Sequence, residues 1–305
     1  MILALAADNP AIAALVAERS PILLEAELVD MVATGNETIQ LAIARRPFVS
    51  RALAAALSEI GSRDACLALL SNSGARLPRF SLERIIERYG DCPNLRLTLF
   101  EREDLPLDLR QVLIRRVSNA LRDLIVSRDW MPSERAEVVI RNAHAHATLA
   151  AASAAPADRI PALVQQLLRA GELTPAFLIR AAGGGQMGLF EAALAALADM
   201  PISRTKALIC SGRAASLKAL LDKAGLPSRT YPAFEAAIEV MRGEGELSGA
   251  FGDYRRATQL IDAILARYRN RPDRELDSIL GLLRQFATDA KRAAARHYAH
   301  QVIAA

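Results

Sequence analysis

Aromatic side chains and cysteines are scarce in this 305-residue chain. Aromatic residues make up 5% of the sequence, with a single tryptophan, and there are three cysteines. Cys66, Cys92 and Cys210 stand far apart and form no C-x-x-C pair, which excludes the common cysteine zinc patterns. An odd, scattered set of thiols is typical of a reduced, cytoplasmic protein. No stretch of 18 residues is apolar and free of charge, so we expect no membrane span.

Residues with catalytic or metal-binding chemistry are also few. Of the four histidines, His144 and His146 are two residues apart and therefore point to different faces of a helix. His297 and His300 share a face, but no further ligand stands at a suitable spacing. We therefore expect no metal site and no bound cofactor. The absence of a nucleophile, base and orienting group in one motif predicts that the protein is not an enzyme.

Gly183–Gly188 is the one glycine-rich run that resembles a phosphate loop, because it precedes a helix. It follows a helix instead of a strand, and no Lys-Ser/Thr pair completes the motif. We interpret it as a helix C-cap with a turn, and an anion site is the weaker alternative.

The chain is rich in alanine and leucine, and hydrophobic residues make up 52% of it, a composition that favours closely packed helices over sheets. The first 117 residues repeat one pattern four times. Aligned at Arg19, Arg46, Asn72 and Arg102, the units step by 27, 26 and 30 residues. A period in this range indicates stacked structural repeats.

Each repeat predicts two short helices with a polar break between them. In the second unit we expect helices over residues 37–45 and 50–60, with apolar residues at helical spacing. A proline falls at each of the four breaks (Pro21, Pro47, Pro78 and Pro106), where a missing N–H suits a helix start. One hairpin cannot bury its apolar face alone, so the hairpins must stack. This predicts an all-α fold that begins as a right-handed α-solenoid.

The polar residues at the repeat breaks, Arg19, Arg46, Asn72 and Arg102, allow two interpretations. As a ladder along one edge they could bind acidic side chains or phosphates. As donors near the end of the first helix they satisfy carbonyl groups that have no partner there. We favour the structural interpretation because every stacked repeat has this capping need.

The second half continues as helices after a break at residues 153–158. We expect a repeat array over residues 1–128, a connecting helix over 129–155 and an all-helical domain over 156–305. Trp130 stands at the first joint, and we expect it to pack there. A catalytic site at this joint, built from Trp130, Arg141 and His144, is the least favoured of the functional hypotheses.

Charge is distributed unevenly along the chain. Residues 202–231 carry six basic groups against one acid, and residues 254–305 carry ten against five. Five of these basic residues form a candidate binding patch: Arg204, Lys206, Arg213, Lys218 and Arg229. Such a patch could attract a polyanion, whereas a solvated helix face is the plainer interpretation.

The last segment, residues 274–303, predicts a long amphipathic helix whose apolar residues keep helical spacing. It would either close the array or pair with a second copy of the chain. We therefore expect a homodimer through this C-terminal helix as one form of assembly.

Several segments resemble a bacterial family known as domain of unknown function 2336. The likeness lies in Ala44–Pro47 and Leu70–Ala75 of the repeats, and in Leu173–Ala181, Phe190–Ala198 and Lys223–Pro227 of the second half. The repeats alone are also similar to HEAT-type helical repeats. The resemblance implies a helical-repeat fold over most of the chain and brings no catalytic motif.

The leading functional hypothesis is a non-enzymatic scaffold that presents a concave helical surface to a protein partner. The alternative is a HEAT-like solenoid that binds nucleic acid through the basic residues of the second half, which the sequence pI near 9.2 favours. Convergence of the five basic residues on one concave face would distinguish the two.

Overall fold

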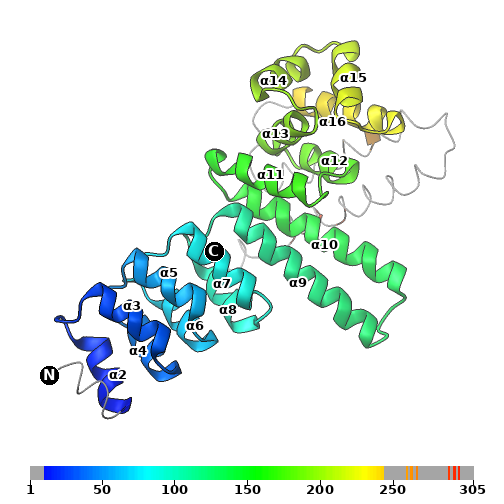
Figure 1. Cartoon of the computed structure of the whole chain (residues 1–305). Coiled ribbons are helices and arrows are strands. Elements are labelled where there is room, and N and C mark those ends of the chain that lie inside the picture. Colours follow the sequence, from blue (N-terminus) through cyan, green and yellow to red (C-terminus); the bar gives the residue numbers. More distant parts are fainter. Residues whose placement is uncertain are drawn as a thin grey trace, which may run out of the picture. The chain divides into compact units, whose positions relative to one another are not determined.

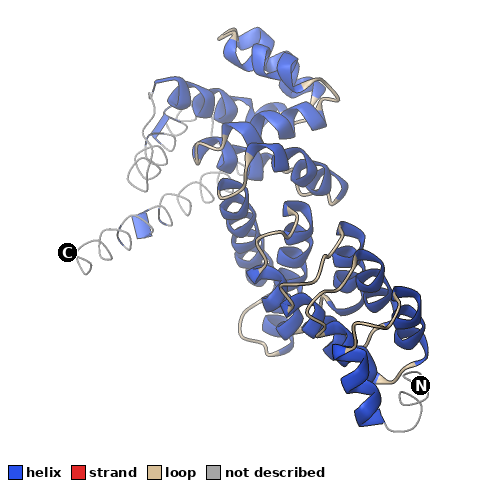
Figure 2. Ribbon diagram, turned by 90° about the vertical axis from the view of Figure 1, so that its left-hand side faces the viewer, coloured by secondary structure: helices blue, strands red, loops and turns tan. Residues whose placement is uncertain are grey.

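The computed structural model describes residues 10–243 and the single positions 259, 262, 263, 266, 288, 291, 292 and 295. All regular secondary structure in this part of the chain is helical, as the sequence predicts (Figure 2). The one β-type contact is an isolated parallel bridge between Val49 and Ala75. Within the described residues, no helix is both long enough and apolar enough to cross a membrane. The predicted C-terminal helix over 274–303, with its dimer contact, lies outside the continuous described range.

The chain divides into two compact units, residues 1–144 and 145–305, and the helix α10 runs across the division. The helices of the first unit are α2 (Pro10–Arg19), α3 (Glu25–Thr34), α4 (Glu37–Ala44), α5 (Arg51–Ile60), α6 (Arg63–Ser71), α7 (Arg79–Tyr89), α8 (Pro93–Glu101), α9 (Leu107–Ser127) and the start of α10 (Ser133–Ser153).

Side-chain caps start several of these helices. Asn36, Ser50 and Ser62 precede α4, α5 and α6, and each accepts a hydrogen bond from the backbone N–H three residues on. Pro78 and Pro106 directly precede α7 and α9, where a fixed φ and a missing N–H carry no cost. The helix bounds in this unit therefore follow from local sequence.

The helices of the first unit form two layers (Figure 1). The first helices of the repeats pack in series, α2 on α4, α4 on α6 and α6 on α8. The second helices do the same, α3 on α5 and α5 on α7. One continuous apolar cluster lies between the layers and includes Ile43, Leu57, Leu69 and Leu99, all fully buried. No single repeat contains a core of its own, so each depends on its neighbours.

The second unit is built around α13 (Met187–Leu197). Its other helices up to residue 243 are the end of α10, η1 (Ala157–Arg159), α11 (Ile160–Arg169), α12 (Pro175–Gly183), α14 (Ile202–Cys210), α15 (Ala214–Lys223), η2 (Ser228–Thr230) and α16 (Tyr231–Gly243). α13 packs against α11, α12, α14 and α15, and α16 packs on α12. The rings of Phe190 and Phe234, both fully buried, stack with their centroids 6.1 Å apart.

The glycine-rich run before α13 is a helix C-cap, as we interpreted it from the sequence. Gly185 has a positive φ of 73°, and its N–H donates to the carbonyl of Ala182. The next N–H, of Gln186, donates to the carbonyl of Ala181. These bonds satisfy the last carbonyls of α12 and turn the chain into α13.

Candidate functional site

Three of the four polar residues at the repeat breaks bond to the backbone of the preceding repeat. The Arg46 guanidinium donates from Nη2 to the carbonyl of Ser20 at 2.9 Å, and from Nη1 to the carbonyl of Ala17. Arg102 Nη1 donates to the carbonyl of Leu70 at 2.7 Å. Each donor reaches a helix end one repeat earlier, so it joins neighbours as well as capping them.

Asn72 makes the same kind of link with a shorter side chain. Its Nδ2 donates to the carbonyls of Ala44 and Arg46, at 2.8 and 2.7 Å, and its Oδ1 accepts from the N–H of Gly74 at 2.8 Å. Arg19 is exposed at the end of α2, the first helix of the described array. Three of the four ladder residues are therefore engaged with backbone carbonyls.

A second set of links joins the other layer, and the sequence pattern did not reveal it. Arg88, near the end of α7, donates to the carbonyls of Ser58 and Gly61, both at 2.8 Å. The Tyr89 hydroxyl also donates to Gly61, at 3.0 Å, and the Arg88 guanidinium lies 4.6 Å from the Tyr89 ring centroid. The sequence signal for this link is that Arg88 stands about one repeat length after the end of α5 at Ile60.

A groove lies between α4 and α6, on the layer of first helices, with a volume of about 690 Å³. Its lining combines apolar side chains with hydroxyls, one cation and one anion: Leu41, Arg45, Asp64, Leu67, Ala68, Ser71, Asn72 and Ser73. Arg45 and Asp64 are both exposed. Asn72 therefore lines the groove and also joins the end of α6 to the end of α4.

Partial burial affects the titration of Arg46, one of the polar residues at the repeat breaks. Partial burial lowers the pKa of the Arg46 guanidinium from its usual value, because the charged form loses hydration. The two carbonyl oxygens it faces replace part of that hydration. A group so engaged offers little to an outside ligand, whereas Arg45, next in sequence, is exposed at the groove.

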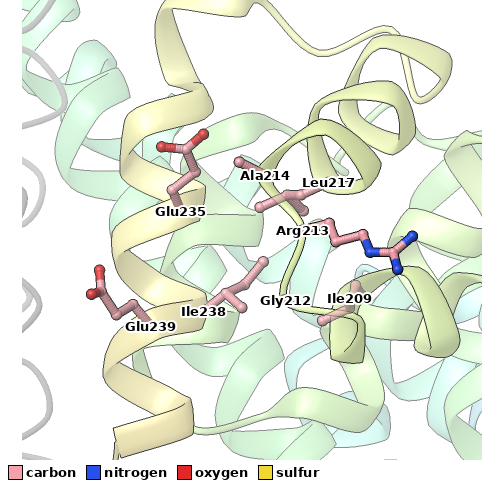
Figure 3. A pocket seen from close by; sticks show the side chains of 8 residues that line it. All are labelled: Ile209, Gly212, Arg213, Ala214, Leu217, Glu235, Ile238 and Glu239. Atoms are coloured by element: carbon pink, nitrogen blue, oxygen red, sulfur yellow. The ribbon is translucent and has the colours of Figure 1, made fainter.

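The five basic residues of the candidate binding patch in the second unit are all exposed. Arg204 and Lys206 lie two positions apart on α14 and so point to different faces of that helix. Arg213 lies at the start of α15 and lines a pocket of about 260 Å³ with Glu235 and Glu239 of α16. Figure 3 shows its guanidinium directed away from both glutamates. Only Arg213 of the five lines this pocket.

Comparison with known proteins assigns the chain to a family. The family model described as "Uncharacterised protein conserved in bacteria (DUF2336)" matches residues 12–274. The chain belongs to the DUF2336 family. The matched range includes the repeats and extends through α16, so membership covers both units. No curated protein and no solved structure matches the chain.

The joint after the array differs from the sequence-based expectation. Trp130 follows α9 and is 65% exposed, so the prediction that it packs at the joint is wrong. Among the described residues, the small apolar cluster next to it in sequence consists of Ile125, Ala136 and Ile140 with Met131, and Trp130 is not a member.

His144 and Arg141, the other two residues of the hypothesised joint site, each contact a polar side chain of α9 or α10. His144 Nε2 lies 2.8 Å from the amide nitrogen of Gln111, and Arg141 pairs with Glu137 at 3.7 Å. Among the described residues, no three His, Cys, Asp or Glu side chains form a group that could hold a metal ion.

Proposed function

We propose that this DUF2336 protein is a non-enzymatic scaffold of the cytoplasm that binds a protein segment along its layer of first helices. In this proposal the first unit is a right-handed α-solenoid of HEAT-like hairpins. The serial packing of α2, α4, α6 and α8 supports it, because stacking of like helices is how repeat arrays form extended binding surfaces.

The observation that carries the proposal is the groove between α4 and α6. Leu41, Leu67 and Ala68 give its lining apolar side chains, while Arg45 and Asp64 supply one charge of each sign. A peptide with an apolar anchor and charged flanks matches such a lining, because apolar burial gives affinity and the charges fix register.

The backbone links favour binding by this surface. Asn72 fixes the end of α6 to the end of α4, and both helices line the groove. A surface that is already ordered pays less conformational entropy when it binds. The array therefore offers a binding surface that is already ordered in the absence of the partner.

A photo-crosslinking amino acid placed in the groove tests the proposal in the native cell. We expect benzoylphenylalanine at Ser71 to give a discrete crosslinked protein, and the same group at Ala52, exposed on α5 in the other layer, to give none. Adding Arg45→Glu should reduce the Ser71 product about tenfold, since reversing a contacting charge costs at least about 1.4 kcal/mol.

The matched control is Arg51→Glu, which reverses an exposed charge at the start of α5, outside the groove. It should leave the Ser71 product unchanged. Equal products from Ser71 and Ala52, or a product that is insensitive to Arg45→Glu, would reject the groove as the binding surface.

Nucleic-acid binding by the second unit is the second candidate, favoured by the exposure of Arg204, Lys206, Arg213, Lys218 and Arg229. Fluorescence anisotropy with labelled DNA and RNA at two salt concentrations tests it. Binding through phosphates weakens steeply with salt, and Lys218→Glu should then reduce affinity. No binding at low salt would remove this candidate and leave the scaffold proposal untouched.

A further inference from the structure

The hydrogen bonds between repeats hold the first helices of successive repeats in the same register. The aligned positions of the four repeats are Arg19, Arg46, Asn72 and Arg102. Each of the last three donates to the carbonyl two residues before the aligned position of the preceding repeat, which belongs to Ala17, Ala44 and Leu70 in turn. Because this bond recurs at three junctions, residues at equal distances from the aligned positions lie in rows across the layer of first helices.

Two such rows lie side by side. The apolar row, five residues before the aligned positions, consists of Ala14, Leu41, Leu67 and Leu97. The polar row, one residue before them, consists of Glu18, Arg45, Ser71 and Glu101. On each helix the two members stand four residues apart, so they share a face and lie about one turn from each other. The middle two members of both rows line the α4–α6 groove.

The apolar row continues beyond the groove at both ends. Leu97 on α8 is 62% exposed. At the other end Ala14 is half-buried, and its neighbour Leu15 on α2 is 54% exposed. The row therefore crosses the first helices of all four repeats, and a ligand longer than the groove finds apolar surface on either side of it.

The polar row presents charges that the protein itself leaves unopposed. Among the described residues, Glu18, Arg45 and Glu101 take part in no ion pair. Asp64, the remaining charge of the groove, pairs with its neighbour Arg63 at 3.0 Å. A ligand of this surface therefore meets the sign pattern of the polar row: negative, positive, neutral and negative.

The spacing of the first helices selects the conformation of an apolar ligand. Packed helices lie about 8–10 Å apart, so the apolar row offers one contact about every 8–10 Å. A polyproline II chain repeats every three residues, which is about 9.3 Å. A β-strand returns to the same face after about 6.7 Å, and a helix after seven residues, about 10.5 Å. Of the three, the polyproline II repeat alone falls within the helix spacing.

We propose that the protein segment bound here is a polyproline II segment with an apolar residue at every third position. This inference rests on the proposed function and adds the conformation and pattern of the partner. In each turn of three residues, one side chain meets the apolar row and a second meets the polar row, about 5.4 Å away. Opposite Glu18, Arg45 and Glu101 the segment carries a base, an acid and a base.

Synthetic peptides of fixed spacing test the conformation. The probe contains four Leu-Pro-X turns in which X is Lys, Glu, Ser and Lys, made in this order and in reverse, because proline keeps itself and the preceding leucine extended. Two comparison peptides carry the same leucines and charges at every second residue, or at every seventh residue of an alanine-rich helix. In fluorescence anisotropy with the full chain, one order of the probe should bind at least about tenfold more tightly than either comparison peptide.

A charge exchange tests the polar row. Arg45→Glu should weaken binding of the probe about tenfold, because it sets two carboxylates against each other. A probe with Lys in place of its Glu should bind this variant about as tightly as the original probe binds the wild type. Arg51→Glu, outside the groove, should change neither affinity.

A substitution on α8 tests whether the contact extends beyond the groove. Leu97→Ser should weaken binding of the probe about fivefold, since it removes one apolar contact of the row. Ile60→Ser, at a 45% exposed position of α5 in the other layer, is the matched control and should leave the affinity unchanged. Both variants should keep the far-UV circular dichroism of the wild type, because both side chains are exposed.

Two results would overturn the inference. One is a probe that binds no better than the comparison peptides in either order. The other is a loss of affinity on Arg45→Glu that the exchanged probe does not restore. Crosslinking from Ser71 reports separately on the proposed function, because it requires only that a protein contacts the groove. A Ser71 product without a preference for the three-residue spacing would keep the groove and reject the conformation. A clear preference without a Ser71 product would keep the recognition pattern and reject binding in the cell.

Discussion

Asn72 holds three backbone groups with one side-chain amide. It donates to two carbonyls of the preceding repeat and accepts one N–H from its own loop. Each bond is 2.7–2.8 Å long, and the side chain is half-buried, so water cannot fully replace the amide if it is removed.

We expect Asn72→Ala to lower the free energy of unfolding of the first unit by about 2 kcal/mol, since it leaves partly buried polar groups without partners. Asn72→Asp should cost more, because a carboxylate would face two carbonyl oxygens and could donate to neither. Urea unfolding followed by circular dichroism measures both. Ser71→Ala, at the exposed neighbour, is the control and should change stability by less than about 0.5 kcal/mol.

The environment of Tyr231 predicts that the stability of the second unit depends on pH. Burial, the hydrogen bond to Asp222 and the charge of Asp222 raise the pKa of the Tyr231 hydroxyl to about 12. The unfolded tyrosine titrates near pH 10, so the unfolded state loses its proton first as pH rises. The stability that Tyr231 contributes is therefore complete below about pH 10 and is lost between pH 10 and about 12.

Comparison with Tyr231→Phe isolates this effect from other titrations. Between pH 9 and 11.5 the wild type should lose stability relative to the variant, as measured by urea midpoints at each pH. Parallel midpoints for the two proteins over that range would show that the hydroxyl titrates alike in the folded and unfolded states.

At the scale of the element, the neighbouring residues Arg88 and Tyr89 fasten the end of α7 to the end of α5. Two donors of Arg88 and the Tyr89 hydroxyl converge on the carbonyls of Ser58 and Gly61. These carbonyls belong to the last turn of α5 and its cap, which have no partners within their own helix.

We expect Arg88→Ala to loosen this junction and to lower the free energy of unfolding by about 1.5–3 kcal/mol, the range for a hydrogen bond that involves a charged group. Hydrogen exchange followed by mass spectrometry should show faster exchange in the peptides covering the end of α5 and the start of α6. Peptides of α12 and α13, in the second unit, provide the internal control. Faster exchange spread evenly over the first unit would instead indicate global destabilisation.

Helix bounds were predictable because their signals are local. Ser50 before α5 and Thr174-Pro175 at the start of α12 act through bonds within one turn, and a period of 26 to 30 residues reveals the repeats. The acceptors of Arg46 and Asn72 lie 26 to 29 residues away, so the donors are visible in the sequence and their partners are not.

The prediction that Trp130 packs at the joint was wrong for a related reason. Whether an aromatic side chain at a helix break is covered depends on which elements lie around it, and composition carries no such information. The α4–α6 groove was equally hidden, because residues of two repeats, among them Arg45 and Asp64, line it together.

At the scale of the molecule, the two units have cores of different kinds. The first unit has a core that runs through successive repeats, with links such as Asn72 between them. The second unit packs its helices around α13, with Phe190 and Phe234 stacked at 6.1 Å in its interior. Because each unit buries its own apolar residues, each should unfold as its own cooperative transition.

Calorimetry of the full chain tests this with one substitution in each unit. Asn72→Ala should lower the melting temperature of one transition, and Phe190→Leu should lower the other, each by several degrees. The loss at Phe190 is about 1–2 kcal/mol, since leucine keeps much of the apolar volume but loses the ring contact with Phe234. The double variant should show both shifts with no interaction between them, as distant sites do. If either single substitution moved the whole melting profile together, the two units would share one cooperative core, and links along the repeats would then stabilise the second unit as well.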